Sequence, residues 1–245
     1  MAYEINLEGQ KALIAGGSSG IGLGIARKLK AAGAQVMITG TKSKAADYED
    51  GEDRTNLNYF QLNATNDEEV KSLADKISTL DIFVSSIGSV AYSRKEYEVE
   101  TFRRIMDINL NGVMHLCTAL KDKLAKSDNG SVVLLGSTSS FLATPGQPAY
   151  SASKGALRTL TKSLAHAWAR HGIRVNGLAP GYVLTKLTQI SRDNDHIYEQ
   201  SIKRIPLRRW GLPEEMGNTT LFLVSPMSSY ITGQMLLADG GITLM

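Results

Sequence analysis

The sequence predicts an α/β fold, with a doubly wound and mostly parallel sheet that carries helices on both faces. Strand-like and helix-like segments alternate along the chain, which is the pattern that places helices on the two faces of a parallel sheet. No linker or internal repeat divides the 245 residues, and 42% of them are hydrophobic, enough for a large core. We therefore expect a single domain over residues 1–245.

Seven short runs of mainly apolar residues predict the strands. They lie near residues 11–15, 35–39, 58–62, 81–85, 131–136, 173–178 and 234–238. Helices are expected near residues 20–32, 66–78, 98–126, 149–171 and 213–225. The polar stretch 41–56 contains Asp50-Gly51 and predicts at most a short or poor helix. The polar insertion at about 184–205 should lie beyond the carboxyl ends of the strands, either as a mobile substrate lid or as a surface loop without a role.

A glycine-rich turn separates the first predicted strand from the first predicted helix. It has the spacing G-x-x-x-G-x-G, with glycines at Gly16, Gly20 and Gly22. Glycine lets the backbone turn tightly and approach a pyrophosphate, while the free N–H groups at the helix start face the anion. This context favours a dinucleotide site, although a turn that merely joins two elements is the alternative. The P-loop pattern is absent, which disfavours a phosphotransferase of that type.

Tyr150 and Lys154 are the candidate catalytic pair. Their four-residue spacing in a predicted helix places both side chains on one face, one turn apart. A phenol normally has a pKa of about 10, and a nearby ammonium, joined by an oxidised nicotinamide ring, would lower it toward neutrality. Tyr182 and Lys186 repeat the spacing, but they follow a Pro-Gly loop signal, and we interpret that pair as a chance match.

The order of seven separated landmarks resembles the short-chain dehydrogenase/reductase family over nearly the whole chain. The landmarks are Gly16-x-x-x-Gly20-Ile21-Gly22, Asn109, Ser137, Tyr150-x-x-x-Lys154, Arg174-Val175-Asn176, Pro180-Gly181 and Asp239-Gly240-Gly241. The resemblance implies a Rossmann-type fold and an oxidoreductase that moves hydride between a nicotinamide and a carbonyl or secondary alcohol. Tyr150 would then be the general acid or base, and Lys154 would lower its pKa and bind the nicotinamide ribose.

Two further catalytic residues are implied by the resemblance. Ser137 precedes Tyr150 by 13 residues and would hold the substrate oxygen, with Ser139 and Ser140 as alternatives for that role. Asn109 would anchor a water relay to Lys154, and Asn111 is its structural competitor.

The end of the second predicted strand bears on the nucleotide. NAD sites usually carry Asp or Glu there, which binds the ribose 2′-hydroxyl. Here the strand runs into Gly40, Thr41 and Lys42, with no carboxylate, so we predict NADP(H) rather than NAD(H), with these residues around the 2′-phosphate. Ser19 stands where many NADP-dependent family members have a basic residue.

The resemblance implies further cofactor contacts from the glycine turn and from the ends of other strands. These are Gly16, Ser18, Ser19, Gly20, Ile21, Gly22, Asn63, Ala64, Ser85, Gly88, Pro180, Gly181, Val183 and Thr185, besides Tyr150 and Lys154. The family's Asn-Asn-Ala-Gly is Ser85-Ser86-Ile87-Gly88 here, and the lost amides predict a cost in stability or cofactor affinity.

The overall sequence pattern is most similar to that of two groups within the family: the 3-oxoacyl-acyl-carrier-protein reductases, and the sugar and alcohol dehydrogenases. The carrier-protein reductases use basic residues where Asp128 and His171 stand, which weakens that alternative without removing it. A non-catalytic dinucleotide-binding regulator is disfavoured because both Tyr150 and Lys154 are present.

Composition excludes several other classes. A net charge of +3 without a basic run argues against a nucleic-acid partner, and no apolar stretch approaches membrane-spanning length. The four histidines lack ligand spacing, so we expect no catalytic metal. The single Cys117 and the absence of a signal-peptide pattern predict a cytoplasmic protein.

The resemblance also implies a homotetramer with an interface on the helices near 98–126 and 149–171. On the second of these, a stripe of large residues is assigned to the protein's own core and a face of small residues to the interface. The large residues are Leu157, Leu160, Leu164 and Trp168, and the small ones are Ala152, Ala156, Thr159 and Ser163.

Overall fold

A computed structural model describes residues 5–244 of the chain. Its seven strands form one sheet in the order β3-β2-β1-β4-β5-β6-β7, and every neighbouring pair is parallel. The strands are β1 (Lys11–Ala15), β2 (Gln35–Gly40), β3 (Asn58–Gln61), β4 (Ile82–Ser85), β5 (Ser131–Leu135), β6 (Arg174–Pro180) and β7 (Met235–Ala238). The predicted fold class is confirmed.

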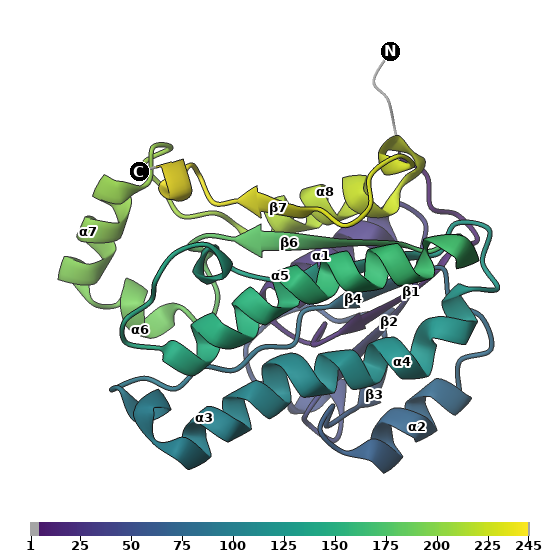
Figure 1. Cartoon of the computed structure of the whole chain (residues 1–245), viewed down its shortest axis with the longest axis horizontal. Helices are drawn as coiled ribbons and strands as arrows, with labels where there is room; N and C mark the ends of the chain where they lie inside the picture. Colours follow the sequence, from purple (N-terminus) through teal and green to yellow (C-terminus); the bar gives the residue numbers. More distant parts are fainter. Residues whose placement is uncertain (1–4, 245) are drawn as a thin grey trace.

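Eight α-helices cover the sheet or extend from it within the described residues (Figure 1). They are α1 (Gly20–Ala31), α2 (Asp67–Asp75), α3 (Val99–Met106), α4 (Gly112–Leu124), α5 (Pro148–Trp168), α6 (Gln189–Arg192), α7 (Asp195–Arg204) and α8 (Pro213–Val224).

The two faces of the sheet are buried against different helices. Because side chains alternate along a strand, Leu13 and Phe83 point to the face covered by α2, α4 and α5, whereas Ile14 and Val84 point to the face covered by α1 and α8. The central strands are therefore apolar at nearly every position, as expected for a sheet buried on both sides.

The chain order reverses between β1 and β4, where strands run outward to either side. In doubly wound sheets, ligands bind at this switch point, beyond the carboxyl ends of the strands. The topology therefore places the carboxyl ends of β1, β4 and β5 side by side at one edge of the sheet.

Two segments differ from the simplest expectation, and a third agrees with it. The predicted helix 98–126 is divided by a π-turn, Asp107–Asn111, into α3 and α4. The stretch 41–56 holds one short helical turn, at Ala45–Asp47, as predicted. The insertion 184–205 contains α6 and α7 instead of loop alone, and the start of α7 is capped by the Asn194 side chain, which accepts from the Ile197 N–H.

No helix within residues 5–244 combines the length and the apolar character needed to cross a bilayer. On α5, Leu157, Leu164 and Trp168 are buried in the core and Leu160 packs against it, as the sequence predicts.

Helices α1 and α8 cross at two glycines. A Cβ placed on Gly24 of α1 would lie 2.6 Å from backbone atoms of Pro213, and one on Gly217 of α8 would lie 2.9 Å from the Gly24 carbonyl oxygen. Each helix thus approaches the backbone of the other more closely than any larger residue permits.

We expect Gly24→Ala to lower the free energy of unfolding by about 1–3 kcal/mol, since the added methyl group must push α1 and α8 apart. Urea titration of the variant beside Gly146→Ala measures this. Gly146 has open space around it, so its substitution is the matched control. Equal stability of the two variants would contradict the close crossing.

Candidate active site

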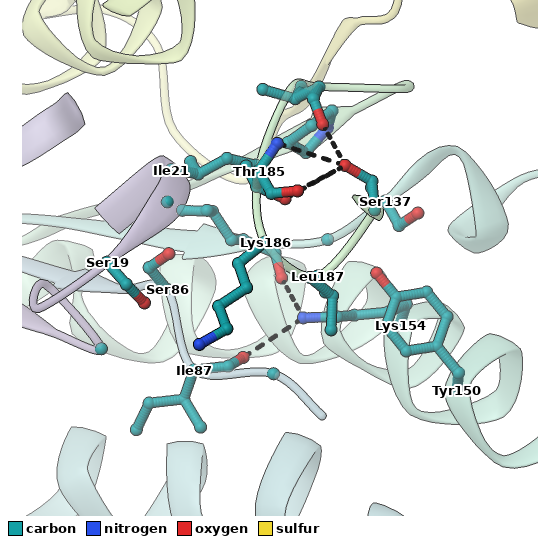
Figure 2. Close-up of a pocket in the computed structure, with 18 of the residues that line it drawn as sticks. Ser19, Ile21, Ser86, Ile87, Ser137, Tyr150, Lys154, Thr185, Lys186 and Leu187 are labelled. Atoms are coloured by element: carbon teal, nitrogen blue, oxygen red, sulfur yellow. Dashed lines mark hydrogen bonds between the residues drawn. The ribbon is translucent and has the colours of Figure 1, made fainter. Parts of the chain in front are cut away.

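A cavity of about 480 Å³ lies beyond the carboxyl ends of β1, β4, β5 and β6 (Figure 2). Four groups of residues line it: the glycine turn after β1, the Ser86–Gly88 segment after β4, Ser137 with α5, and the chain that follows β6. The predicted site residues among them are Gly16, Ser19, Gly20, Ile21, Gly88, Ser137, Tyr150, Lys154, Pro180, Gly181, Val183 and Thr185.

Tyr150 and Lys154 lie one turn apart on α5, as predicted, and both face this cavity. Pro148 occupies the first helical position, where its missing N–H leaves no intrahelical bond unmade. The Lys154 Nζ lies 5.7 Å from the centre of the Tyr150 ring. It donates to the Leu135 carbonyl oxygen at 2.8 Å and to that of Ile87 at 3.4 Å (Figure 2).

Burial dominates the titration of this pair. Lys154 is only 3% exposed, and desolvation lowers its pKa to about 8. Desolvation also raises the pKa of the Tyr150 phenol, a hydrogen bond from Ser137 works against that rise, and the charges of Tyr92 and Glu96 add to it. Lys154 is not among the causes that shift Tyr150, so in the protein alone the pKa of Tyr150 moves opposite to the predicted lowering.

Ser137 is the serine of its segment that faces the cavity. The other two are engaged elsewhere: Ser140 Oγ donates to the Lys154 carbonyl oxygen at 2.7 Å, and Ser139 Oγ accepts from Thr144 at 2.8 Å. The Ser137 Oγ accepts from the Ser139 N–H at 3.1 Å, which orients the hydroxyl at the start of a short turn. The structure thus places Ser137, and neither alternative, beside Tyr150.

Asn109 is fully buried in the π-turn between α3 and α4 and does not line the cavity. Its amide nitrogen donates to the Ser89 carbonyl oxygen at 2.9 Å and to Ser153 Oγ at 3.0 Å. Its oxygen accepts from the Ser89 N–H at 2.7 Å, so one acceptor position of the side chain remains. Asn109 therefore joins α5 to the Ser89 segment, and a π-turn is the kind of irregularity that aims a side chain inward. Its competitor Asn111 bonds Asp107 instead.

The glycine turn forms a cradle suited to a diphosphate. Gly16 and Gly20 have φ angles of +75° and +51°, a region that other residues rarely adopt. A Cβ on Gly16 would lie 3.0 Å from the Ser86 backbone, so glycine also permits the close approach of β1 and β4 at this edge. Since α1 begins at Gly20, its free N–H groups and positive dipole end open into the cavity.

Several predicted cofactor residues do not line the cavity. These are Ser18, Gly22, Gly40, Thr41, Lys42, Asn63, Ala64 and Ser85. Gly40, the last residue of β2, and the two residues that follow it, Thr41 and Lys42, lie against Tyr48. The Tyr48 hydroxyl accepts from the Lys42 N–H at 3.4 Å. Burial tends to raise the pKa of Tyr48, but hydrogen bonds from Ser18, Lys42 and others outweigh it, so that pKa is lowered.

Ser85 lies deeper, in β4, where it is 2% exposed. Its hydroxyl is among the buried polar atoms without a hydrogen-bond partner within residues 5–244. The amide that the family carries at this position would have more donors and acceptors than the hydroxyl, which gives the predicted cost a structural basis.

The second Tyr–Lys pair is not a catalytic pair in the structure. Tyr182 stacks on Trp210 with ring centres 5.0 Å apart, outside the cavity, while Lys186 lines it. Lys186, Leu187 and Ile190 bring the 184–205 insertion to the cavity wall.

Sequence reasoning missed three residues that contact the predicted site residues. Tyr48 covers Gly40, and Arg54 donates to the Ser18 carbonyl oxygen at 2.7 Å. Glu96 accepts from the Tyr150 N–H at 2.8 Å. Each lies in an irregular segment between regular elements, where neither periodicity nor motif spacing marks an inward side chain.

A phenol, a buried lysine and an oriented serine lie beside an anion cradle at the switch point, which is the arrangement that the family resemblance implies for an oxidoreductase with a doubly wound sheet. The residues of this cradle fit a dinucleotide, because Gly16 and Gly20 adopt the positive φ angles of a tight turn at the start of α1, and Gly88 leaves room beside Lys154. A Cβ on Gly88 would lie 3.5 Å from the Lys154 Nζ.

Comparison with known proteins agrees with this class. The family model described as "Enoyl-(Acyl carrier protein) reductase" matches residues 15–243. The 2-dehydro-3-deoxy-D-gluconate 5-dehydrogenase of Bacillus subtilis is 34% identical over 242 residues, covering 96% of this chain and 95% of that protein. The 3-oxoacyl-(acyl-carrier-protein) reductase of Rickettsia bellii is 36% identical over 245 residues, covering 98% of this chain and 100% of that protein.

Among solved structures, the gluconate 5-dehydrogenase of Burkholderia cenocepacia, in complex with NADP and tartrate, superposes with a TM-score of 0.90. It is 31% identical, and the match covers 99% of this chain and 98% of that one. The chain therefore belongs to the short-chain dehydrogenase/reductase family and is an oxidoreductase, as its motifs predict.

Ser85→Ala should raise the free energy of unfolding by about 1 kcal/mol, because it removes a buried hydroxyl that has no partner. Thermal and urea unfolding would measure the gain. Ser131→Ala is the matched control: Ser131 is also fully buried in the sheet, but its hydroxyl contacts Leu223 and Arg174, so its loss should be destabilising. A loss of stability in Ser85→Ala would show that the hydroxyl is satisfied.

Proposed function

We propose that the protein interconverts a small-molecule carbonyl compound and the corresponding secondary alcohol, with NADP(H) as the nucleotide and Tyr150 as the proton donor or acceptor. The observation that carries this proposal is the convergence of Tyr150, Lys154 and Ser137 on the cavity that the glycine turn also lines. When bound, the nicotinamide supplies or takes up the hydride.

The chain's own residues manage the proton. In the reducing direction the Tyr150 hydroxyl donates its proton to the carbonyl oxygen, and in the oxidising direction the phenolate takes the alcohol proton back. Ser137 donates a hydrogen bond to the same oxygen and stabilises the charge that develops there. Lys154 supplies positive charge beside the Tyr150 ring and would hold the nicotinamide ribose, and Asn109 holds the Ser89 segment against α5.

Tyr150→Phe should lower kcat about 100-fold or more, because the ring keeps its shape but loses the transferable proton. Nucleotide affinity, measured by fluorescence titration, should change less than about threefold. A panel of ketones, sugars and acyl thioesters assayed with NADPH and NADH provides the activity measurement. Full turnover by this variant would refute the catalytic role of Tyr150.

The choice of NADP(H) is supported by the chain and by its relatives. The end of β2 has no carboxylate to repel a 2′-phosphate, and Lys42 adds a positive charge there. The Burkholderia cenocepacia relative and two other similar solved dehydrogenases hold NADP. We place Gly40, Thr41 and Lys42 around the 2′-phosphate, with Asn63 and Ala64 toward the adenine.

Lys42→Glu should therefore weaken NADPH binding about tenfold relative to NADH, since the reversed charge repels the 2′-phosphate that only NADPH carries, in addition to the diphosphate that both share. Calorimetric titration of both nucleotides gives the ratio. Lys44→Glu makes the same change of net charge two residues further along and should shift the ratio less than about threefold. Equal effects of the two variants on the ratio would argue against the position assigned to the phosphate.

We favour a small-molecule substrate. Lys186 and Lys154 are the ionisable cations at the cavity, and its lining contains no carboxylate, which suits an anionic or polyhydroxylated compound. Reduction of a 3-oxoacyl group on a carrier protein is the second candidate, supported by the Rickettsia bellii relative.

The insertion 184–205 is the proposed substrate lid, because Lys186 and Leu187 of this segment line the cavity.

We also propose a homotetramer in the cytoplasm. The small residues Ala152 and Thr159 lie exposed on α5, and Phe102 and Val99 are partly exposed on α3, which leaves both faces open to another copy. Buried Cys117 is consistent with a reducing compartment, where an unpaired thiol is stable.

A further inference from the structure

Glu96 is a buried carboxylate to which the proposed chemistry gives no part. It lies in a short turn, Lys95–Tyr97, between β4 and α3, and it is 0% exposed. None of the ion pairs found among residues 5–244 includes it. Burying a carboxylate without a cation costs free energy of folding unless hydrogen bonds replace its hydration. The hydrogen-bond partners of Glu96 therefore indicate its role.

Both oxygens of Glu96 accept hydrogen bonds from the main chain. Oε1 accepts from the Ala91 N–H at 2.9 Å, and Oε2 accepts from the Tyr150 N–H at 2.8 Å. Ala91 belongs to the segment that leads to Tyr92, whose hydroxyl donates to the Leu187 carbonyl oxygen at 2.6 Å. One side chain thus links the catalytic helix to the cavity wall and, through Tyr92, to the insertion over the cavity.

The first turn of α5 lacks the usual means of satisfying its N–H groups. Gln147, at the N-cap position, makes no side-chain cap, and no acidic residue lies in the first turn. The exposed N–H groups and the positive end of the helix dipole therefore need an acceptor from elsewhere. Glu96 provides it at Tyr150 itself, the third residue of the helix.

The two residues that lead into the turn carrying Glu96 are held in an unfavourable conformation. Ser93 and Arg94 both have a φ of 58°, in the left-handed region that residues other than glycine rarely adopt. Such strain persists where surrounding contacts over-determine the backbone. Here those contacts include the two Glu96 bonds and the Tyr97 hydroxyl, which donates to the Pro145 carbonyl oxygen just before α5.

We propose that Glu96 is the positioning residue for Tyr150, fixing the first turn of α5 to the Ala91–Tyr92 wall so that the phenol faces the substrate. This deepens the proposed function, because it rests on the role of Tyr150 given above. The ionisable groups that face Tyr150 are Lys154, whose Nζ lies 5.7 Å from the ring centre on the same helix, and Tyr92 and Glu96, whose charges act on the phenol from the facing segment. The charge of Glu96 raises the pKa of that phenol, since a nearby anion disfavours phenolate.

Glu96→Gln tests the proposal with little change of shape. The amide can accept at only one atom, so either the Ala91 or the Tyr150 N–H loses its acceptor and faces a donor. We expect kcat to fall about tenfold or more, while the Kd for NADPH stays within about twofold, because Glu96 does not line the cavity. Glu98→Gln is the matched control: it makes the same change two residues away at an exposed position.

The decisive measurement is the titration of the Tyr150 phenol, which a merely structural residue would leave unmoved. The phenolate absorbance of Tyr150 is isolated by subtracting spectra of the corresponding Tyr150→Phe protein, in the wild-type and Glu96→Gln backgrounds. Loss of the negative charge should move the midpoint to lower pH by roughly half a unit. The rising limb of kcat/KM for alcohol oxidation should move in the same direction, and Glu98→Gln should move neither.

An unmoved phenolate midpoint in Glu96→Gln would overturn the proposal, and so would failure of that variant to fold, which would make Glu96 a residue of the global fold. The titration requires no substrate. A protein that turns over none of the carbonyl compounds tested, yet shows the shifted midpoint, would refute the proposed function and leave the link between Glu96 and Tyr150 standing.

Discussion

The buried ammonium of Lys154 is the constraint on which the geometry of this protein depends. It is 3% exposed and forms no ion pair within residues 5–244. Two carbonyl oxygens hold it: that of Leu135, the last residue of β5, and that of Ile87, just after β4. The two oxygens lie close together because the neighbouring parallel strands β4 and β5 end at the same edge of the sheet. The two bonds tie α5, and with it Tyr150, to that edge.

A second charge balances the first from the opposite side of Tyr150. Lys154 lies one turn beyond the phenol, and Glu96 meets the helix at the Tyr150 N–H. Within residues 5–244 neither forms an ion pair, and each is satisfied by main-chain groups instead. Tyr150 itself lines the cavity, and the two buried charges beside it act at a lower effective dielectric than they would in water. Burial is the main cause that raises the pKa of Tyr150, and the charges of Tyr92 and Glu96 add to it.

The sequence was sufficient for the sheet and for one side of the site. Strands such as Val132–Leu135 are buried on both faces and therefore appear in the sequence as continuous apolar runs. The turn after β1 requires positive φ angles, and the glycines that permit them are recognised directly in the sequence. The 13-residue spacing selected Ser137, which lines the cavity in the structure, whereas the hydroxyls of Ser139 and Ser140 bond Thr144 and the Lys154 carbonyl oxygen. Helix α7 was missed because it is polar overall, although Asn194 as a cap and the spacing of Tyr198 and Ile202, which pack near Trp210, could have indicated it.

The hydrogen-bond partners of the buried polar side chains could not be predicted, and the physical cause is the same in each case. Lys154 bonds carbonyl oxygens, Asn109 bonds both the N–H and the C=O of Ser89, and Glu96 bonds two N–H groups. Each of these pairs joins a specific side chain to a main-chain group that every residue except proline can offer in full. The side chain of each pair can therefore be identified from the sequence, whereas the main-chain group that it bonds depends only on the path of the backbone. Motif spacing found Lys154 and Asn109 because the family resemblance supplied the missing partner. Glu96 had no such support, and its role became visible only when the turn at 95–97 was placed against the start of α5.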